Sequence, residues 1–192
     1  MKTIYINKNT INDDNNEIKN NNSNEKSKKR EIIKTAIQDA SLCKFIEEIK
    51  TDSNKQLNLL YDIHSNNDKN FIGKKFIINE IRNKINNYKS QDKKKNLHDN
   101  ENLITINNII QKLIDSNLSC YYCKCNLYLI FESVRYKKQW TLDRLNNLDE
   151  HSNENTIISC LECNLQRRRK NSDKFLFTKK IETNQIIIKK IS

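Results

Sequence analysis

The chain has 192 residues, of which 35% are hydrophobic and 31% charged, and this composition argues against one large core built from the whole length. Lysine and arginine outnumber aspartate and glutamate by 35 to 24, and the formal net charge of +11 favours polyanionic partners such as DNA. No stretch approaches the ~20 apolar residues of a membrane helix, and the first residues lack the apolar core of a secretory signal, so we expect an intracellular, soluble protein.

The composition is strongly biased, and this limits what the lysines can mean. Asparagine (32), lysine (28) and isoleucine (28) supply 88 of the 192 residues, while glycine occurs once and proline not at all. Such usage is typical of an A/T-rich genome, so the lysine excess is weak support for nucleic-acid binding. Residues that depart from the bias, namely the cysteines, the clustered arginines, Trp140 and His151, are more informative.

In chain order, residues 1–30 are polar and end in a basic run, and we expect a disordered basic tail with at most a short strand over residues 3–6. Residues 31–116 form a helical region of unknown role. Apolar residues at steps of three and four predict its four helices, at 31–50, 57–64, 76–88 and 103–116. The single glycine, Gly73, separates the second helix from the third, and residues 89–101 have the composition of a polar linker.

Two Cys-x2-Cys pairs give the strongest chemical signal. Cys120 and Cys123 form the first pair, and Cys160 and Cys163 form the second. Two such knuckles offer four thiolates to one ion in a tetrahedral zinc site. Because four thiolates leave no open position, we expect the zinc to be structural and to clamp two distant segments together. Cys125 does not extend the pattern and is interpreted as a spare thiol.

Between and after the pairs the sequence predicts a ββα unit. A strand begins at Gln139, a polar loop covers residues 146–154, a second strand covers 155–159, and a helix runs from Cys160 to about Asn171. The predicted fold is α+β, a helical N-terminal region followed by a small zinc-stapled ββα domain at 117–192. Apolar residues between 175 and 191 are expected to pack back, and Ile186 to Ile188 fit either a strand or a helix.

This pattern resembles the HNH endonuclease family of the zinc-stapled, ββα-metal type. The similarity covers roughly residues 118–172 and rests on the cysteine pairs, on Asp143-Arg144, on His151 and on Asn155 nine residues before Asn164. The resemblance implies that Asp143 and Asn164 hold a catalytic Mg2+ or Mn2+, whose preference for oxygen ligands matches them. It also implies that Asn155 ties down the loop between the strands by hydrogen bonds to its backbone.

One position departs from most of the family. Asp143 is followed by Arg144 where most members have a histidine that activates water, and an arginine cannot accept that proton. Similar phage and viral sequences have His or Tyr at the later position that His151 takes here. His151 is therefore the candidate base, with a solvent-facing turn histidine as the alternative.

Arginines in this lysine-biased chain are the candidate DNA contacts. Arg144, Arg167, Arg168, Arg169 and Lys170 are predicted to reach DNA phosphates, the last four from the helix that follows Asn164. The alternative for Arg144 is a pair with a carboxylate such as Glu162 or Asp149. For the others it is a solvated helix face.

Taken together, the sequence predicts a metal-dependent DNA endonuclease that nicks one strand. Cleavage of both strands would need two copies, which predicts a homodimer for that reaction. The base composition and the phage-like motif favour a virus or mobile element as the source. Two alternatives stay open: a zinc-stapled DNA-binding module without catalysis, and a zinc-ribbon adaptor that binds protein. The second of these predicts no salt-dependent DNA affinity.

Overall fold

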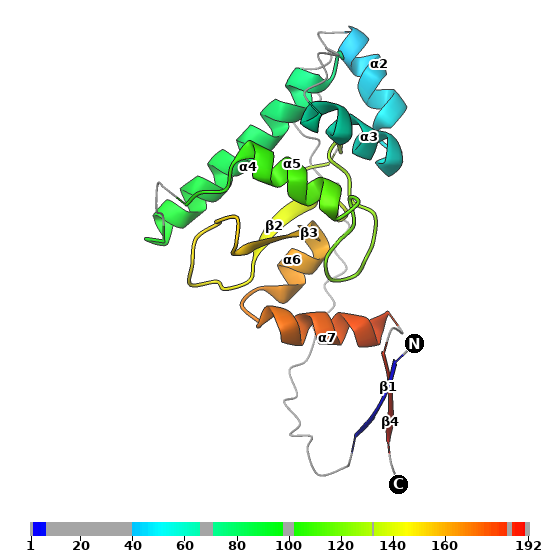
Figure 1. Ribbon diagram of the computed structural model, residues 1–192, viewed down its shortest axis with the longest axis vertical. Coiled ribbons are helices and arrows are strands. Elements are labelled where there is room, and N and C mark those ends of the chain that lie inside the picture. Colours follow the sequence, from blue (N-terminus) through cyan, green and yellow to red (C-terminus); the bar gives the residue numbers. More distant parts are fainter. Residues whose placement is uncertain are drawn as a thin grey trace.

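A computed structural model describes residues 2–6, 40–65, 71–97, 102–131, 133–183 and 186–190 of the chain. Residues 7–39, which include most of the predicted tail and the start of the first predicted helix, lie outside this part. The described elements are six helices, a two-stranded antiparallel sheet and a two-stranded parallel sheet, so the α+β prediction is confirmed (Figure 1). None of the described helices is long and apolar enough to cross a lipid bilayer.

The helical region is found where the apolar period predicts it. It contains α2 (Ala40–Ile49), α3 (Ser53–His64), α4 (Lys74–Lys94) and α5 (Ile106–Asp115). Asp52 caps α3 by accepting from the backbone N of Lys55, and Thr105 forms a capping box with Asn108 at the start of α5. The third predicted helix was too short, because α4 continues through the polar residues that were interpreted as a linker.

The single glycine has a packing reason. Gly73 precedes α4, and a Cβ built on it would lie 1.9 Å from Cε1 of Phe45 on α2. Only a residue without a side chain therefore allows the Phe45 ring to lie against this backbone. The one glycine of the chain therefore lies where α2 contacts the start of α4.

The carboxyl half contains the predicted ββα unit. β2 (Trp140–Arg144) pairs antiparallel with β3 (Thr156–Cys160), with Trp140 opposite Cys160 and Asp143 opposite Ile157. α6 (Leu161–Arg167) follows β3 directly and is shorter than predicted, since Arg168 has a φ of 52° and ends it. α7 (Ser172–Glu182) then begins at an Asn171 cap.

The two ends of the described chain meet in the parallel sheet. β1 (Lys2–Ile6) pairs with β4 (Ile186–Lys190), and this pair lies at the opposite end of the molecule from α2 (Figure 1). The short strand expected at residues 3–6 is therefore present, and Ile186 to Ile188 are in a strand.

The predicted boundary at residue 116/117 is not a break in packing. One continuous cluster of buried apolar side chains includes Leu60, Ile81 and Leu113 from the helical region and Trp140 and Ile158 from the sheet. α4 and α5 lie beside the β2–β3 hairpin in Figure 1. The helical region and the ββα unit thus share a core, and this brings α4 next to the predicted site.

Candidate functional site

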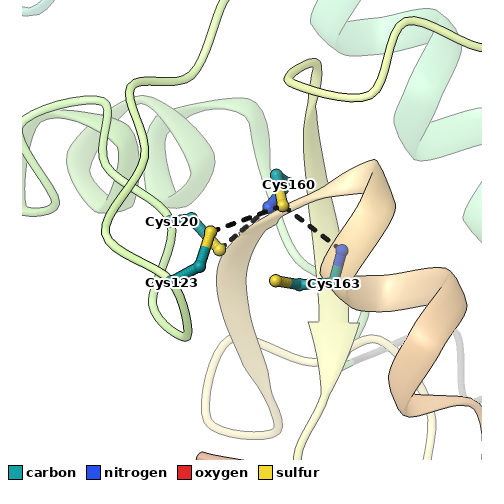
Figure 2. Close-up of side chains that lie close together, drawn as sticks. All are labelled: Cys120, Cys123, Cys160 and Cys163. Carbon is teal, nitrogen blue, oxygen red and sulfur yellow. Dashed lines mark hydrogen bonds between the residues drawn. The ribbon is translucent and has the colours of Figure 1, made fainter. Parts of the chain in front are cut away.

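The four motif cysteines come together from two segments. Cys120 and Cys123 lie on a tight turn, Cys160 ends β3, and Cys163 lies in the first turn of α6 (Figure 2). Their Sγ atoms all lie within 4.8 Å of one another. The turn is fastened to β3 by the backbone N of Tyr121, which donates to the carbonyl of Ile158 at 2.9 Å.

Backbone amides already point at the sulfurs. The amide of Cys160 donates to Sγ of Cys120, and the amide of Cys163 donates to Sγ of Cys160, both at 3.3 Å. Such N–H donors stabilise thiolates. Hydrogen bonds among the sulfurs, first the one with Cys123, lower the pKa of Cys120, whereas contacts with Cys120, Cys123 and Cys160 raise that of Cys163. Four adjacent thiolates repel one another, so all four can be ionised together only if a cation lies among them.

The arrangement fits a structural zinc. Tetrahedral Zn–S bonds of about 2.3 Å place sulfurs about 3.8 Å apart. Sγ of Cys123 and Sγ of Cys160 are 3.9 Å apart, close to this spacing, and all four sulfurs lie within 4.8 Å of one another. The four cysteines are thus positioned to hold a metal ion of the predicted kind. Cys125 accepts from the amide of Cys120 through its backbone carbonyl, so its peptide group helps to close the turn.

Beside the thiol cluster, the hairpin and α6 form one wall of a cleft of about 470 Å³. Asp143 on β2 and Asn164 on α6 both line it. The amide nitrogen of Asn164 donates to Oγ1 of Thr141 and to the carbonyl of Leu142, both at 3.1 Å. These bonds fix the amide plane, and no described hydrogen bond uses Oδ1 of Asn164. The side chains expected to bind a cation therefore share the cleft, and the amide oxygen is left available.

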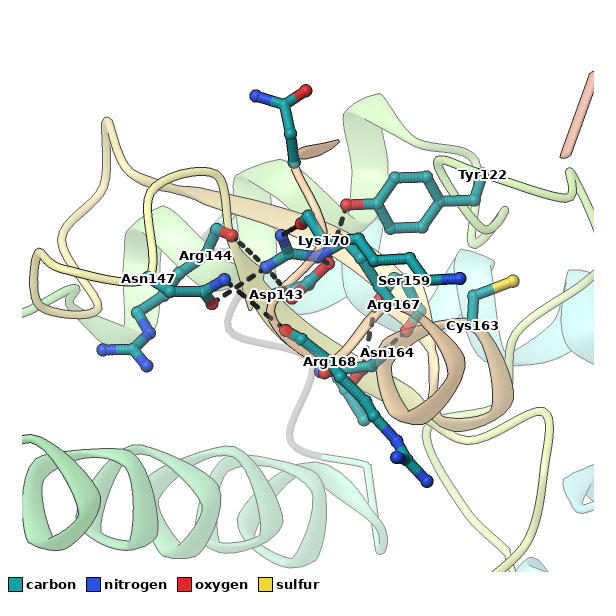
Figure 3. A network of polar contacts seen from close by, with 12 residues as sticks. Tyr122, Asp143, Arg144, Asn147, Ser159, Cys163, Asn164, Arg167, Arg168 and Lys170 are labelled. Atoms are coloured by element: carbon teal, nitrogen blue, oxygen red, sulfur yellow. Dashed lines mark hydrogen bonds and ion pairs between the residues drawn. The ribbon is translucent and has the colours of Figure 1, made fainter. Parts of the chain in front are cut away.

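Asp143 has a partner that the sequence did not suggest. Arg167 donates from Nε to Oδ2 at 2.6 Å and from Nη2 to Oδ1 at 2.8 Å, and the hydroxyl of Tyr122 donates to Oδ2 at 2.7 Å (Figure 3). Arg167 also donates to the carbonyls of Arg144 and Lys170. Its side chain is fully buried. Arg167, which the sequence predicts to contact DNA phosphates, is therefore enclosed by acceptors of the protein itself.

The remaining predicted DNA contacts differ in exposure. Arg168, Arg169 and Lys170 are exposed, and Arg168 lines the cleft. Arg144 is buried, and its Nη1 donates to the carbonyl of Asp149 at 2.8 Å and lies 3.5 Å from Oδ1 of Asp92. Of the two alternatives for Arg144, a carboxylate partner is present, but it comes from α4. Arg144 also lines the cleft, so one side of it faces that space.

Asn155 makes the hydrogen bonds that were predicted for it. Its Nδ2 donates to the carbonyls of Asn146 at 3.0 Å and Glu150 at 2.8 Å, and its Oδ1 accepts from the amide of Asn146 at 2.8 Å. One side chain thus joins both ends of the loop between β2 and β3. The loop that contains His151 is thereby held in one shape.

His151 is buried, with 4% of its surface exposed, and lines the same cleft. Its backbone N donates to Oδ2 of Asp92 at 2.9 Å, and its Nδ1 lies 2.8 Å from Oδ1. The centroid of the imidazole ring lies 4.6 Å from that of the Tyr88 ring. The backbone carbonyl of His151 accepts a hydrogen bond from the amide of Ile104. Burial lowers the pKa of His151, and the hydrogen bond to Asp92 partly opposes this. The alternative of a solvent-facing turn histidine is therefore wrong.

α4 forms the facing wall of the cleft and supplies residues that sequence reasoning missed. Lys84, Asn87, Tyr88, Gln91 and Lys95 line the cleft at helical spacing. Asp92 lies behind them and is fully buried. The period of α4 could have indicated a shared face, but no local signal marks Asp92, which lies 59 residues from His151 in sequence.

The charges of the lining are mostly positive. Lys84, Lys95, Arg144 and Arg168 line the cleft, and Asp143 is the one acidic residue among the described lining residues. Such a lining attracts anions.

No known protein family, curated protein or solved structure matched the chain when each was compared with it. The resemblance to HNH endonucleases therefore rests on the sequence motifs of this chain alone.

Proposed function

We propose that the cleft between α4 and the β2–β3–α6 unit is the active site of a metal-dependent DNA endonuclease of the HNH type. The strongest support is that Asp143 from a strand, His151 from a loop and Asn164 from a helix line the same cleft. Most charged side chains of this cleft are basic. The expected reaction is hydrolysis of a phosphodiester bond in one DNA strand.

The residues present suit a hard divalent cation. Oδ1 of Asp143 accepts one described hydrogen bond, from Arg167, and Oδ1 of Asn164 accepts none among the described residues. Mg2+ or Mn2+ would be held by these two oxygens and by the substrate phosphate, and would polarise the phosphate. Arg167 competes for the same carboxylate, so we expect the cation to bind weakly until DNA adds its own oxygens.

The protein side chains divide the remaining tasks. His151 is the proton acceptor, because burial lowers its pKa and so favours the neutral ring. Arg144 and Arg168 line the cleft and neutralise phosphate charge. Asn155 holds the loop, and Arg169 and Lys170, exposed beside the cleft, contact the DNA backbone.

The pair between Arg167 and Asp143 also favours a second candidate, a zinc-stapled DNA-binding module without catalysis. A carboxylate that is permanently paired with a buried guanidinium could be purely structural. Under this alternative the basic cleft binds DNA, and Asp143 fastens α6 to β2.

Plasmid nicking separates the two candidates. Zinc-loaded wild type with Mg2+ or Mn2+ should convert supercoiled plasmid to open circles, and Asp143→Asn and Asn164→Ala should each lose about 10²-fold or more in rate. Asp115→Asn, an exposed carboxylate on α5, is the matched control and should cut normally. Salt-sensitive DNA binding by the wild type without cleavage in either metal would favour the binding module.

A further inference from the structure

The strongest feature outside the predicted site is a buried carboxylate on α4. Asp92 lies in the last turns of the helix, is 0% exposed, and has its charge where the helix dipole disfavours an anion. Such a placement costs stability unless partners compensate for it. The partners are His151, through its backbone N and Nδ1, and Arg144.

We propose that Asp92 is a positioning residue that holds the His151 imidazole in one tautomer and one orientation, with Nε2 as the base of the cleft. This inference rests on the proposed function. It also gives the helical region a role, since α4 would supply both a wall of the cleft and the partner of the base.

The tautomer follows from the geometry. An ionised carboxylate only accepts hydrogen bonds, so Nδ1 must carry the proton that is shared with Asp92. Nε2 then keeps its lone pair, and no described hydrogen bond occupies it. Because the amide of His151 binds the same carboxylate, the ring and its backbone are fixed together. The ring of Tyr88, tilted by 30° against the imidazole at 4.6 Å, limits rotation further.

The bond and proton changes of this hydrolysis involve only water, the phosphodiester and the His151 ring. As the water oxygen bonds to phosphorus, its proton passes to Nε2, and the bond from phosphorus to the leaving oxygen breaks. The leaving oxygen takes a proton from solvent, and the imidazolium later returns its own proton to solvent. Asp92 stabilises that imidazolium.

The Asp92 carboxylate also gives a partner to Arg144, which stands where most of the family has the base histidine. Nη1 of Arg144 lies 3.5 Å from Oδ1 of Asp92. Arg144 therefore occupies the strand position beside Asp143, while the base comes from the loop. The charged and titratable groups that face His151 are Asp92 and Tyr88 from α4, Lys95 directly after α4, and Arg144 from β2. Arg144 and Lys95 disfavour the imidazolium, whereas Asp92 favours it.

The test compares wild type with Asp92→Asn by nitrogen NMR of the imidazole and by the pH profile of nicking. In the wild type we expect the neutral Nδ1–H form and an acidic limb of kcat below the ordinary histidine value of about 6.5. Asp92→Asn should lose the tautomer preference and shift the limb to lower pH, because the carboxylate that favours the imidazolium is gone. Its kcat should fall about 10²- to 10⁴-fold with KM for DNA nearly unchanged.

Asp62→Asn on α3 is the matched control and should change neither readout. An Nε2–H ring in the wild type would overturn the proposal even if Asp92→Asn does not fold. An unchanged kcat and pH profile in a folded Asp92→Asn would overturn the positioning role alone. Absence of nicking by the wild type, with the Nδ1–H form in place, would instead overturn the proposed function and the base role with it.

Discussion

Two neighbouring arginines show how the surroundings decide what a residue does. Arg167 is buried and donates to Asp143 and to two backbone carbonyls, whereas Arg169, two residues later, is exposed. The turn of the chain at Arg168, with its φ of 52°, separates them. One guanidinium therefore stabilises the fold of the site, while the other is exposed to solvent.

We predict opposite effects for these two arginines. Arg167→Met leaves the Asp143 carboxylate buried without its partner and should lower the free energy of unfolding by about 3–5 kcal/mol. Arg169→Met should change that free energy by less than about 0.5 kcal/mol but reduce the salt slope of DNA binding by about 1. Urea unfolding and a salt series of DNA affinities measure the two quantities. A stable Arg167→Met with weakened DNA binding would contradict the assignment.

At this scale the sequence indicates the residue types of the site but not all their partners. The cysteine pairs could be identified from their spacing, and Asp143, Asn155 and Asn164 through the family resemblance. Arg167 could not be separated from Arg168 and Arg169, since a run of arginines predicts a shared role. Asp92 stayed hidden because its contact with His151 depends on tertiary packing.

Among the elements, α4 determines the shape of the cleft. Its apolar face, with Ile77, Ile81 and Ile85, packs into the core, and a polar face lines the cleft. The sequence predicts the first part of this helix from its apolar period. The last turns are polar because they face the cleft and hold Asp92, so the same residues have the composition of a linker. The prediction for α6 is too long, because nothing in the arginine run marks where this helix ends.

Lys93, in the last turn of α4, and Lys95, just after it, should contribute differently to DNA binding. Lys95 lines the cleft and Lys93 does not, although both are exposed. Lys95→Ala should weaken DNA binding and reduce the salt slope by about 1, because one phosphate contact is lost. Lys93→Ala should leave the slope nearly unchanged. Equal effects of the two substitutions would show that DNA does not enter along this face of α4.

For the whole molecule, the thiol cluster connects the parts that form the site. It joins the turn at Cys120 to the β3–α6 corner, and Asn164 directly follows the last of the four cysteines. Trp140 pairs with Cys160 across the sheet and is 1% exposed. A metal ion held by these cysteines would therefore contribute folding free energy to the half of the chain that carries Asp143 and Asn164.

Removal of the metal should unfold this half. Cys160→Ser, or a strong chelator, should shift the fluorescence of the single tryptophan to longer wavelength, because Trp140 becomes exposed to water. Cys43→Ser on α2, outside the cluster, should keep the wild-type spectrum and one zinc per chain. A folded, zinc-free Cys160→Ser protein would contradict a structural role of the metal.

Anomalous diffraction from crystals of the protein with DNA and Mn2+ would decide whether the cleft holds a catalytic cation. We predict a zinc peak among Cys120, Cys123, Cys160 and Cys163 and a manganese peak at bonding distance from the oxygens of Asp143 and Asn164. A cleft with DNA bound, no manganese peak, and Asp143 still paired only with Arg167 and Tyr122 would contradict the proposed nuclease.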